Sequence, residues 1–163
     1  MNDAISNQRL ALVHPLLAEK VNAAAARLAA EGTYFRVAQG LRTYAEQDAL
    51  YAQGRTAPGH IVTNARGGHS NHNFGCAVDC YPFLSGTSGE LNWNAETPQF
   101  QMMVSVLKAQ GLLWGGDWKA IVDPPHFQLM NFPVTPTEAD RVAFAEGGLE
   151  AVWKMYDQKV SVG

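Results

Sequence analysis

The sequence has little positive charge and no long apolar run. Lys and Arg number 12 against 15 Asp and Glu, and the net charge of −3 gives none of the basic surface expected of a nucleic-acid-binding protein. The longest apolar stretches fall far short of the roughly 18 residues that a membrane-spanning helix needs. Hydrophobic residues make up 47% and charged residues 17% of the 163, which indicates a globular chain with one core.

Cysteine is scarce too, because Cys76 and Cys80 are the only two. On a strand their four-residue spacing would separate them by roughly 13 Å. A disulfide requires Cα atoms within about 7 Å. We therefore expect two free, buried thiols in a reducing compartment, with zinc ligation by them as the alternative.

The N-terminal segment lacks the features of an export signal. Met1 to Ser6 contains one acid and no basic cluster. We expect a protein that stays in the cytoplasm where it is made, unless another factor releases it. The length predicts a single domain over residues 1–163.

Hydrophobic periodicity predicts mixed helices and strands without regular alternation. Helices are expected over 10–30, with Pro15 in the first turn, over 44–52 with a Thr43–Glu46 capping box, over 98–110, and over 137–159 with an interruption at Gly147-Gly148. Strands are expected over 34–41, 77–83 and 126–129. Residues 55–69 read as a loop with a short extended piece at 61–63, and 112–118 as a turn-rich aromatic segment. The fold class is therefore α+β.

Two short motifs combine histidine and aspartate. The first is Ser70-x-His72-x-x-Gly75-x-Ala77-x-Asp79, and the second is Asp123-Pro124-Pro125-His126. Two imidazoles and one carboxylate form the protein part of a catalytic zinc site, in which a fourth position stays open for water. His72, Asp79 and His126 are thus the candidate metal ligands, and the predicted function is that of a metallohydrolase.

The spacing of these residues limits how they can meet. His72 and Asp79 would lie roughly 23 Å apart on one strand and about 10 Å apart along one helix. Both distances are too long for one ion, so the chain must turn back between them, and Asn71, Asn73 and Gly75 tolerate such turns. We expect His72 on a loop or strand end and Asp79 on the next strand, with Val78 facing the core.

The Asp-Pro-Pro-His segment cannot lie inside a helix. Polyproline geometry would project Asp123 and His126 to the same side. Asp123 would then stand just outside the metal ligands, where a general base can take a proton from water and pass it to a leaving amine. A plain Pro-Pro turn is the alternative. His14 and His60 are not expected to be ligands, and His69 is a candidate substrate contact.

Both motifs resemble those of the M15 peptidases, which include D-alanyl-D-alanine carboxypeptidases and dipeptidases and the phage L-alanyl-D-glutamate endopeptidases. Two further segments also resemble the phage branch: Gly40-Leu41-Arg42-Thr43-Tyr44-x-x-Gln47-x-x-Leu50-Tyr51-x-x-Gly54-Arg55 and Trp114-Gly115-Gly116-Asp117-Trp118. The resemblance covers residues 33 to 130. It implies a small central antiparallel sheet flanked by helices, as in the hedgehog/D-Ala-D-Ala peptidase-like fold.

The resemblance also implies roles for individual residues. His72, Asp79 and His126 would bind zinc, Asp123 would be the catalytic base, and Arg42 would lie near the scissile carbonyl. A guanidinium there can stabilise an oxyanion, while a salt bridge at a helix start is the alternative for Arg42. The candidate substrate contacts are Ser70, Gln47, Tyr44, His69 and Trp114, although packing or orienting roles are open for Gln47 and Tyr44, and a core position for Trp114.

The function implied is that of a phage or prophage endolysin, a zinc endopeptidase cutting peptidoglycan stem peptides at L-alanyl-D-glutamate. Such a monomeric enzyme would need a separate membrane-permeabilising protein to reach periplasmic peptidoglycan from the host cytoplasm. A D,D-carboxypeptidase or dipeptidase of the same fold is the first alternative. The second, of a different class, is a non-catalytic zinc module that binds peptidoglycan.

Overall fold

The computed structural model describes residue 1 and residues 3–157. Its α-helices are α1 (Ala4–Leu10), α2 (Pro15–Ala30), α3 (Tyr44–Ala52), α4 (Pro98–Ala109) and α5 (Glu138–Asp157), and two short 3-10 helices are η1 (Asn71–Phe74) and η2 (Gly115–Asp117). The strands are β1 (Phe35–Gln39), β2 (Ala77–Pro82), β3 (Leu112–Trp114) and β4 (His126–Leu129).

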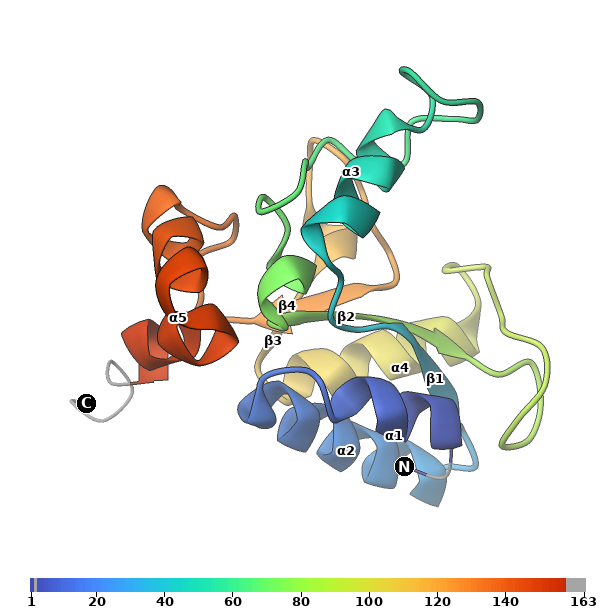
Figure 1. Ribbon diagram of the computed structural model, residues 1–163. Helices are drawn as coiled ribbons and strands as arrows, with labels where there is room; N and C mark the ends of the chain where they lie inside the picture. Colours follow the sequence, from blue (N-terminus) through green and yellow to red (C-terminus); the bar gives the residue numbers. More distant parts are fainter. Residues whose placement is uncertain (2, 158–163) are drawn as a thin grey trace.

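One antiparallel sheet in the order β1-β2-β4-β3 forms the centre. Helices α1, α2 and α4 lie on one side of the sheet, α3 rises on the other side, and α5 lies at one end (Figure 1). The expected α+β class, with a small antiparallel sheet flanked by helices in one domain, is confirmed.

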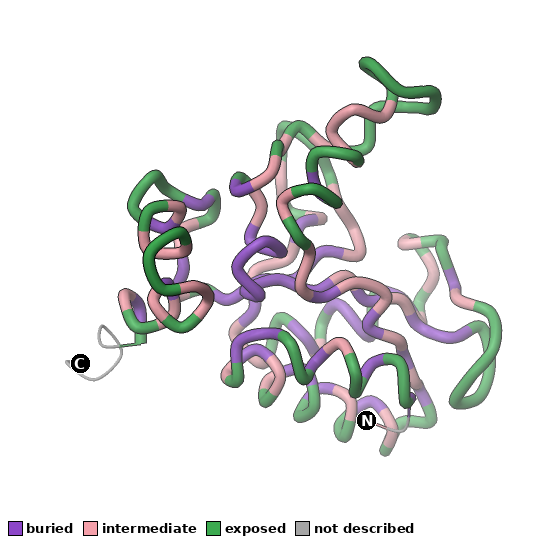
Figure 2. The backbone as a smooth tube through the Cα atoms, in the orientation of Figure 1, coloured by how far each residue is buried: buried purple, intermediate pink, exposed green. Residues whose placement is uncertain are grey.

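The two faces of the sheet have different chemistry because side chains alternate along each strand. Val78, Cys80, Phe127 and Leu129 are fully buried in the core that α2 and α4 cover. Buried backbone runs through the sheet and the inner sides of these helices, while the segment after α3 is largely exposed (Figure 2). The opposite face of β2 and β4 is thereby left for polar side chains.

The N-terminal region departs from expectation, because one helix over 10–30 was predicted and two helices form. Helix α1 ends at Leu10, and His14 caps α2 by accepting a hydrogen bond from the Leu16 backbone N–H through Nδ1, at 3.1 Å. Pro15 is the first residue of α2, as expected, since it has no N–H to leave unpaired there.

Other boundaries follow the sequence closely. Helix α3 spans 44–52 with the Thr43–Glu46 capping box, and the last helix is interrupted at Gly148, whose φ is 68°. Its expected end at 159 lies outside the described residues. Residues 55–69 form no strand, in agreement with a loop, and the segment 112–118 differs from expectation in part, because β3 comes before the short 3-10 turn η2. Within the described residues, no helix is both long and apolar enough to span a bilayer.

Candidate metal centre and active site

A tight turn places His72. Ser70 and Asn73 form a capping box at the start of η1, and Gly75 ends it in the left-handed region at φ 65°. Only a residue without a Cβ adopts this conformation readily, and the turn reverses the chain into β2. His72 therefore lies on a 3-10 helix rather than on the loop or strand end we expected, while Asp79 lies on the following strand as predicted.

Strand pairing brings Asp79 and His126 together. They are direct partners in the β2–β4 ladder, and directly opposed residues project to the same face. On the other side of β2, the register with β1 shifts between Val37 and Gln39, which makes a bulge opposite Asp79. Gly40 follows the bulge directly and turns its carbonyl towards His72.

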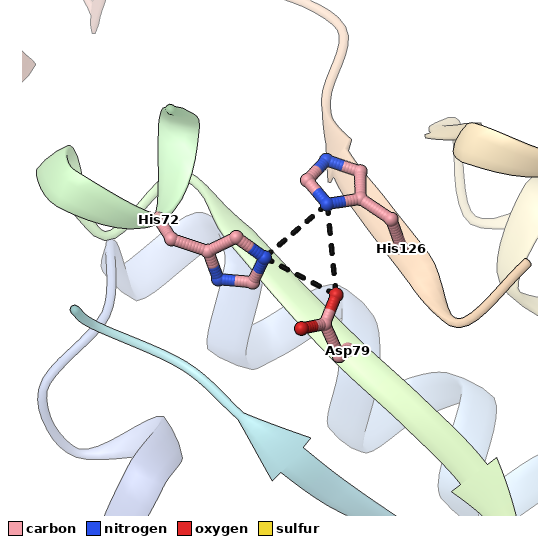
Figure 3. Close-up of side chains that lie close together, drawn as sticks. All are labelled: His72, Asp79 and His126. Carbon is pink, nitrogen blue, oxygen red and sulfur yellow. Dashed lines mark hydrogen bonds and ion pairs between the residues drawn. The ribbon is translucent and has the colours of Figure 1, made fainter. Parts of the chain in front are cut away.

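The three candidate ligand atoms form a compact triangle (Figure 3). His72 Nε2 lies 3.2 Å from Asp79 Oδ1 and 3.2 Å from His126 Nδ1, and His126 Nδ1 lies 3.6 Å from Asp79 Oδ1. Atoms held at about 2.0–2.1 Å by one tetrahedral ion lie roughly 3.3–3.4 Å apart. The triangle therefore fits a tetrahedral zinc ion with one position left open.

The outer imidazole nitrogens determine which atoms face the triangle. His72 Nδ1 donates to the Gly40 carbonyl at 2.8 Å, and His126 Nε2 donates to Gln128 Oε1 at 2.9 Å. Gln128 is oriented in turn by donating its amide to the Val134 carbonyl at 3.3 Å. In this orientation the two inner nitrogens can direct their lone pairs at a cation held beside the Asp79 carboxylate.

Asp79 is ionised at this position, as a metal-binding carboxylate must be. Burial opposes ionisation of Asp79, but His72 and His126 outweigh it and hold the pKa of this carboxyl well below its usual range. Among the described residues, this is the one group of three His, Cys, Asp or Glu side chains close enough to bind an ion together. Cys76 and Cys80 are free thiols buried in the core, as expected, so the zinc alternative for them is wrong.

Arg42 lies beside the triangle. Its Nη2 is 3.4 Å from Asp79 Oδ2, and its Nη1 donates to Gln47 Oε1 at 2.8 Å. Gln47 is buried and donates its amide to the Ala65 carbonyl at 2.9 Å. The guanidinium is thus held in one orientation next to the candidate metal position.

Asp123 approaches from the other side. The His126 backbone N–H donates to the Asp123 carbonyl at 3.1 Å, so Asp-Pro-Pro-His forms a hydrogen-bonded turn and not the polyproline geometry we expected. The turn still puts both side chains on one side, with Asp123 Oδ2 3.9 Å from His126 Nδ1. Burial, and then the charge of Asp79, raise the pKa of Asp123.

Comparisons with known proteins agree with this geometry. Residues 63–129 match a family described as D-alanyl-D-alanine carboxypeptidase. The chain is 38% identical over 125 residues, covering 72% of its own length and 74% of the relative, to the peptidoglycan L-alanyl-D-glutamate endopeptidase CwlK of Bacillus subtilis (strain 168). The chain belongs to the M15 peptidase family.

A solved structure of the same kind is similar as well. The L-Ala D-Glu endopeptidase ChiX of Serratia marcescens matches with a TM-score of 0.55 and 28% identity, covering 78% of this chain and 87% of that one. For this M15 peptidase, the match extends the likeness from the motifs to the arrangement of sheet and helices.

The triangle of this peptidase opens into a cleft of about 470 Å³. Arg42, Asp123, Ser70 and His69 line it, together with Trp118, whose ring centroid is 4.8 Å from that of His126. The cleft thus collects the candidate ligands, base, guanidinium and two of the five expected substrate contacts.

The other three expected contacts lie outside the cleft lining. Gln47 is buried behind Arg42. Tyr44 stacks on Phe144 with ring centroids 5.3 Å apart. Trp114 pairs with Phe127 across the sheet and so shares the core face, while its Nε1 donates to the Pro124 carbonyl at 2.7 Å. Trp114 therefore supports the Asp-Pro-Pro-His turn from behind.

Several residues of this site escaped the sequence interpretation. Gly40 and Gln128 orient the two imidazoles, and Asn73 donates its side-chain amide to the Arg42 carbonyl at 2.9 Å. A Cβ on Gly115 would lie 2.5 Å from the Asp123 carbonyl oxygen and 2.9 Å from His126 Cβ. The Gly-Gly pair before the second motif was a signal for Gly115, and the alternation His126-x-Gln128 was a signal for Gln128.

Proposed function

We propose that this M15 peptidase is a zinc-dependent peptidoglycan endopeptidase that hydrolyses the bond between L-alanine and D-glutamate in stem peptides. The observation that carries the proposal is the His72–Asp79–His126 triangle at 3.2–3.6 Å, with Asp123 and Arg42 in the same cleft. Similarity to two endopeptidases named for this bond supports the choice of substrate.

The triangle supplies two imidazoles and one carboxylate, which is the donor set of a catalytic zinc site. When bound, the ion supplies Lewis acidity and activates water. The residues around it must then place the peptide carbonyl, hold the negative charge that develops on its oxygen, and move one proton from water to the departing nitrogen.

Asp123 fits the proton-transfer role. Its carboxylate lines the cleft beside His126 and its side chain is 42% exposed, so it reaches solvent and substrate. One carboxylate oxygen accepts a proton from the attacking water and returns it to the D-glutamate nitrogen as the amide C–N bond breaks. The products are a free L-alanine carboxylate and a free amine.

Arg42 fits the role of charge stabilisation. It is held by Gln47 and lies 3.4 Å from the Asp79 carboxylate, which leaves donors directed into the cleft. A fixed guanidinium in a partly buried cleft favours a carbonyl oxygen that becomes negatively charged. Ser70 and His69, which line the same cleft, remain proposed substrate contacts.

Digestion of purified sacculi, followed by mass spectrometry of the products, tests the proposal. New C-terminal L-alanine on the glycan-bound fraction, together with peptides that begin with D-glutamate, is the expected result. Loss of terminal D-alanine alone would point to the carboxypeptidase activity named by the family description and would overturn the choice of bond. Binding of sacculi without any cleavage would favour a non-catalytic module.

An endolysin role is the finer part of the proposal. It rests on the resemblance of the Gly40–Arg55 segment to the phage branch. Expression in a bacterial host should then cause lysis only when a membrane-permeabilising protein is co-expressed. Lysis that is equally fast without it would contradict this part and leave the endopeptidase activity untouched.

A further inference from the structure

A second hollow adjoins the metal cleft and has one charged residue, Arg66, in its lining. It has a volume of about 400 Å³ and is lined by Tyr51, Asn64, Ala65, Arg66, His69 and Thr135. Four of these residues, Asn64, Ala65, His69 and Thr135, also line the metal cleft. The two hollows therefore lie side by side, with a shared wall between them.

A fixed turn presents the side chains of Arg66 and His69 to this hollow. The His69 backbone N–H donates to the Arg66 carbonyl at 3.0 Å, so the two residues are the ends of one turn. The glycines between them are anchored, because Gly67 N–H donates to Asp48 Oδ1 at 2.7 Å and Gly68 N–H donates to Asn73 Oδ1 at 3.0 Å. Asn73 is in the same 3-10 helix as His72, so the turn is coupled directly to the metal site.

Arg66 has donors to spare. Its guanidinium lies over the Tyr51 ring, with Cζ 4.8 Å from the ring centroid. None of the ion pairs between described residues involves Arg66, although Asp48 attracts it from outside the hollow. A guanidinium has five N–H donors, so most of them remain available to a ligand.

Arg55 uses its donors differently, although it also packs on Tyr51, at 4.0 Å. It donates to the carbonyls of Tyr51 and Thr63 and to Asn64 Oδ1, at 2.7, 3.0 and 2.8 Å. Arg55 therefore stabilises the loop after α3 through these hydrogen bonds, whereas Arg66 lines the hollow. Two like charges beside one phenol ring further favour an anion at this place.

The proposed substrate has a matching anion next to the scissile bond. Glutamate has two carboxyl groups, and the stem peptide can continue through only one of them. The other remains a free carboxylate on the residue whose nitrogen leaves. We propose that Arg66, with His69 beside it, binds this free carboxylate of D-glutamate and so selects substrates that carry it. This inference rests on the proposed function and adds its specificity determinant.

The test compares two synthetic stem peptides that contain L-alanyl-D-glutamate, one with the free carboxylate and one with that group as a carboxamide. The wild-type enzyme is expected to cleave the carboxylate form with a kcat/KM about 10- to 100-fold higher, the range of a charge-assisted hydrogen bond. In Arg66→Gln this ratio should fall towards one, because only the carboxylate form loses a partner. Arg66→Lys should keep part of the preference.

Controls separate this site from its surroundings. Arg27→Gln makes the same charge change on the exposed surface of α2 and should leave the ratio unchanged. A third peptide, amidated only at its C-terminal carboxylate, should be cleaved like the free peptide, which distinguishes the glutamate group from a carboxylate further along. Cleavage of the carboxamide peptide by Arg66→Gln serves as the check of folding.

The outcomes are distinct. Equal cleavage of both peptides by the wild type, or an equal loss on both in Arg66→Gln, would overturn the carboxylate site while leaving the endopeptidase proposal intact. A preference that follows the C-terminal carboxylate would place the site on another residue of the substrate and overturn the assignment. Cleavage of no peptide by the wild type would overturn the proposed function and this site with it.

Discussion

Replacing Gln128 by leucine should weaken metal binding without touching a ligand. Gln128 is 1% exposed, and its Oε1 accepts from His126 Nε2 at 2.9 Å, which directs His126 Nδ1 into the ligand triangle. Leucine has nearly the same volume and no acceptor, so the imidazole N–H would be left buried without a partner. Such a donor costs about 1–3 kcal/mol.

This cost sets the size of the effect. Loss of a hydrogen-bond partner behind a metal-binding histidine lowers metal affinity by about 10- to 100-fold. That range corresponds to about 1.4–2.8 kcal/mol, which agrees with the cost of the unpaired donor. The expected result for Gln128→Leu is a zinc dissociation constant 10- to 100-fold higher in competition titrations against a chelator of known affinity.

Gln47→Leu is the matched control. Gln47 is also 1% exposed, but it holds Arg42 and the Ala65 carbonyl instead of a histidine. Its replacement should leave zinc affinity within about threefold of the wild type and lower kcat, because Arg42 loses its orientation. A Gln128→Leu variant whose zinc affinity changes as little as that of Gln47→Leu would refute the proposed role of the His126–Gln128 hydrogen bond.

Three further substitutions test other parts of the structure. Asp123→Asn should lower kcat by about 10²- to 10⁴-fold while the protein keeps its metal, measured by turnover and metal content, and full activity would exclude Asp123 as the base. Gly115→Ala puts a Cβ 2.5 Å from the Asp123 carbonyl oxygen, so thermal unfolding should show a loss of about 1–3 kcal/mol together with lower activity; unchanged values would mean that the turn yields easily. Burial opposes ionisation of Asp3, but hydrogen bonds from Arg36 and Ser6 outweigh it and lower its pKa from 3.8 to about 2, which corresponds to about 2 kcal/mol of folding free energy. This contribution is present above pH 3.8 and is lost as the pH falls towards 2. In urea unfolding, Asp3→Asn should therefore be less stable than wild type at about pH 5 and nearly equal to it at about pH 2. A stability difference that is independent of pH would contradict the ion pair.

The sequence predicted the parts of the site that depend on residue type and local spacing. His72, Asp79 and His126 could be chosen because few side chains bind zinc, and the Thr43–Glu46 box fixed the start of α3 because capping is local. The turn at Gly75 followed from the need to reverse the chain between two ligands.

Features that depend on strand register could not be predicted from the sequence in this way. Trp114 faces the core because it is opposite Phe127, and the β3–β4 pairing that decides this joins residues that no local pattern links. The bulge opposite Asp79, which brings the Gly40 carbonyl to His72, is also a property of two paired strands. The break before α2 was missed because His14 is an uncommon capping residue.

Metal content measured alongside activity on sacculi tests the central claim most directly. Wild-type protein should contain one zinc ion per chain, lose both metal and activity on dialysis against a chelator, and regain both when zinc is added. The His126→Ala variant should have neither bound zinc nor activity, and added zinc should restore neither. Undiminished cleavage of sacculi by metal-free protein would contradict a metal centre at His72, Asp79 and His126.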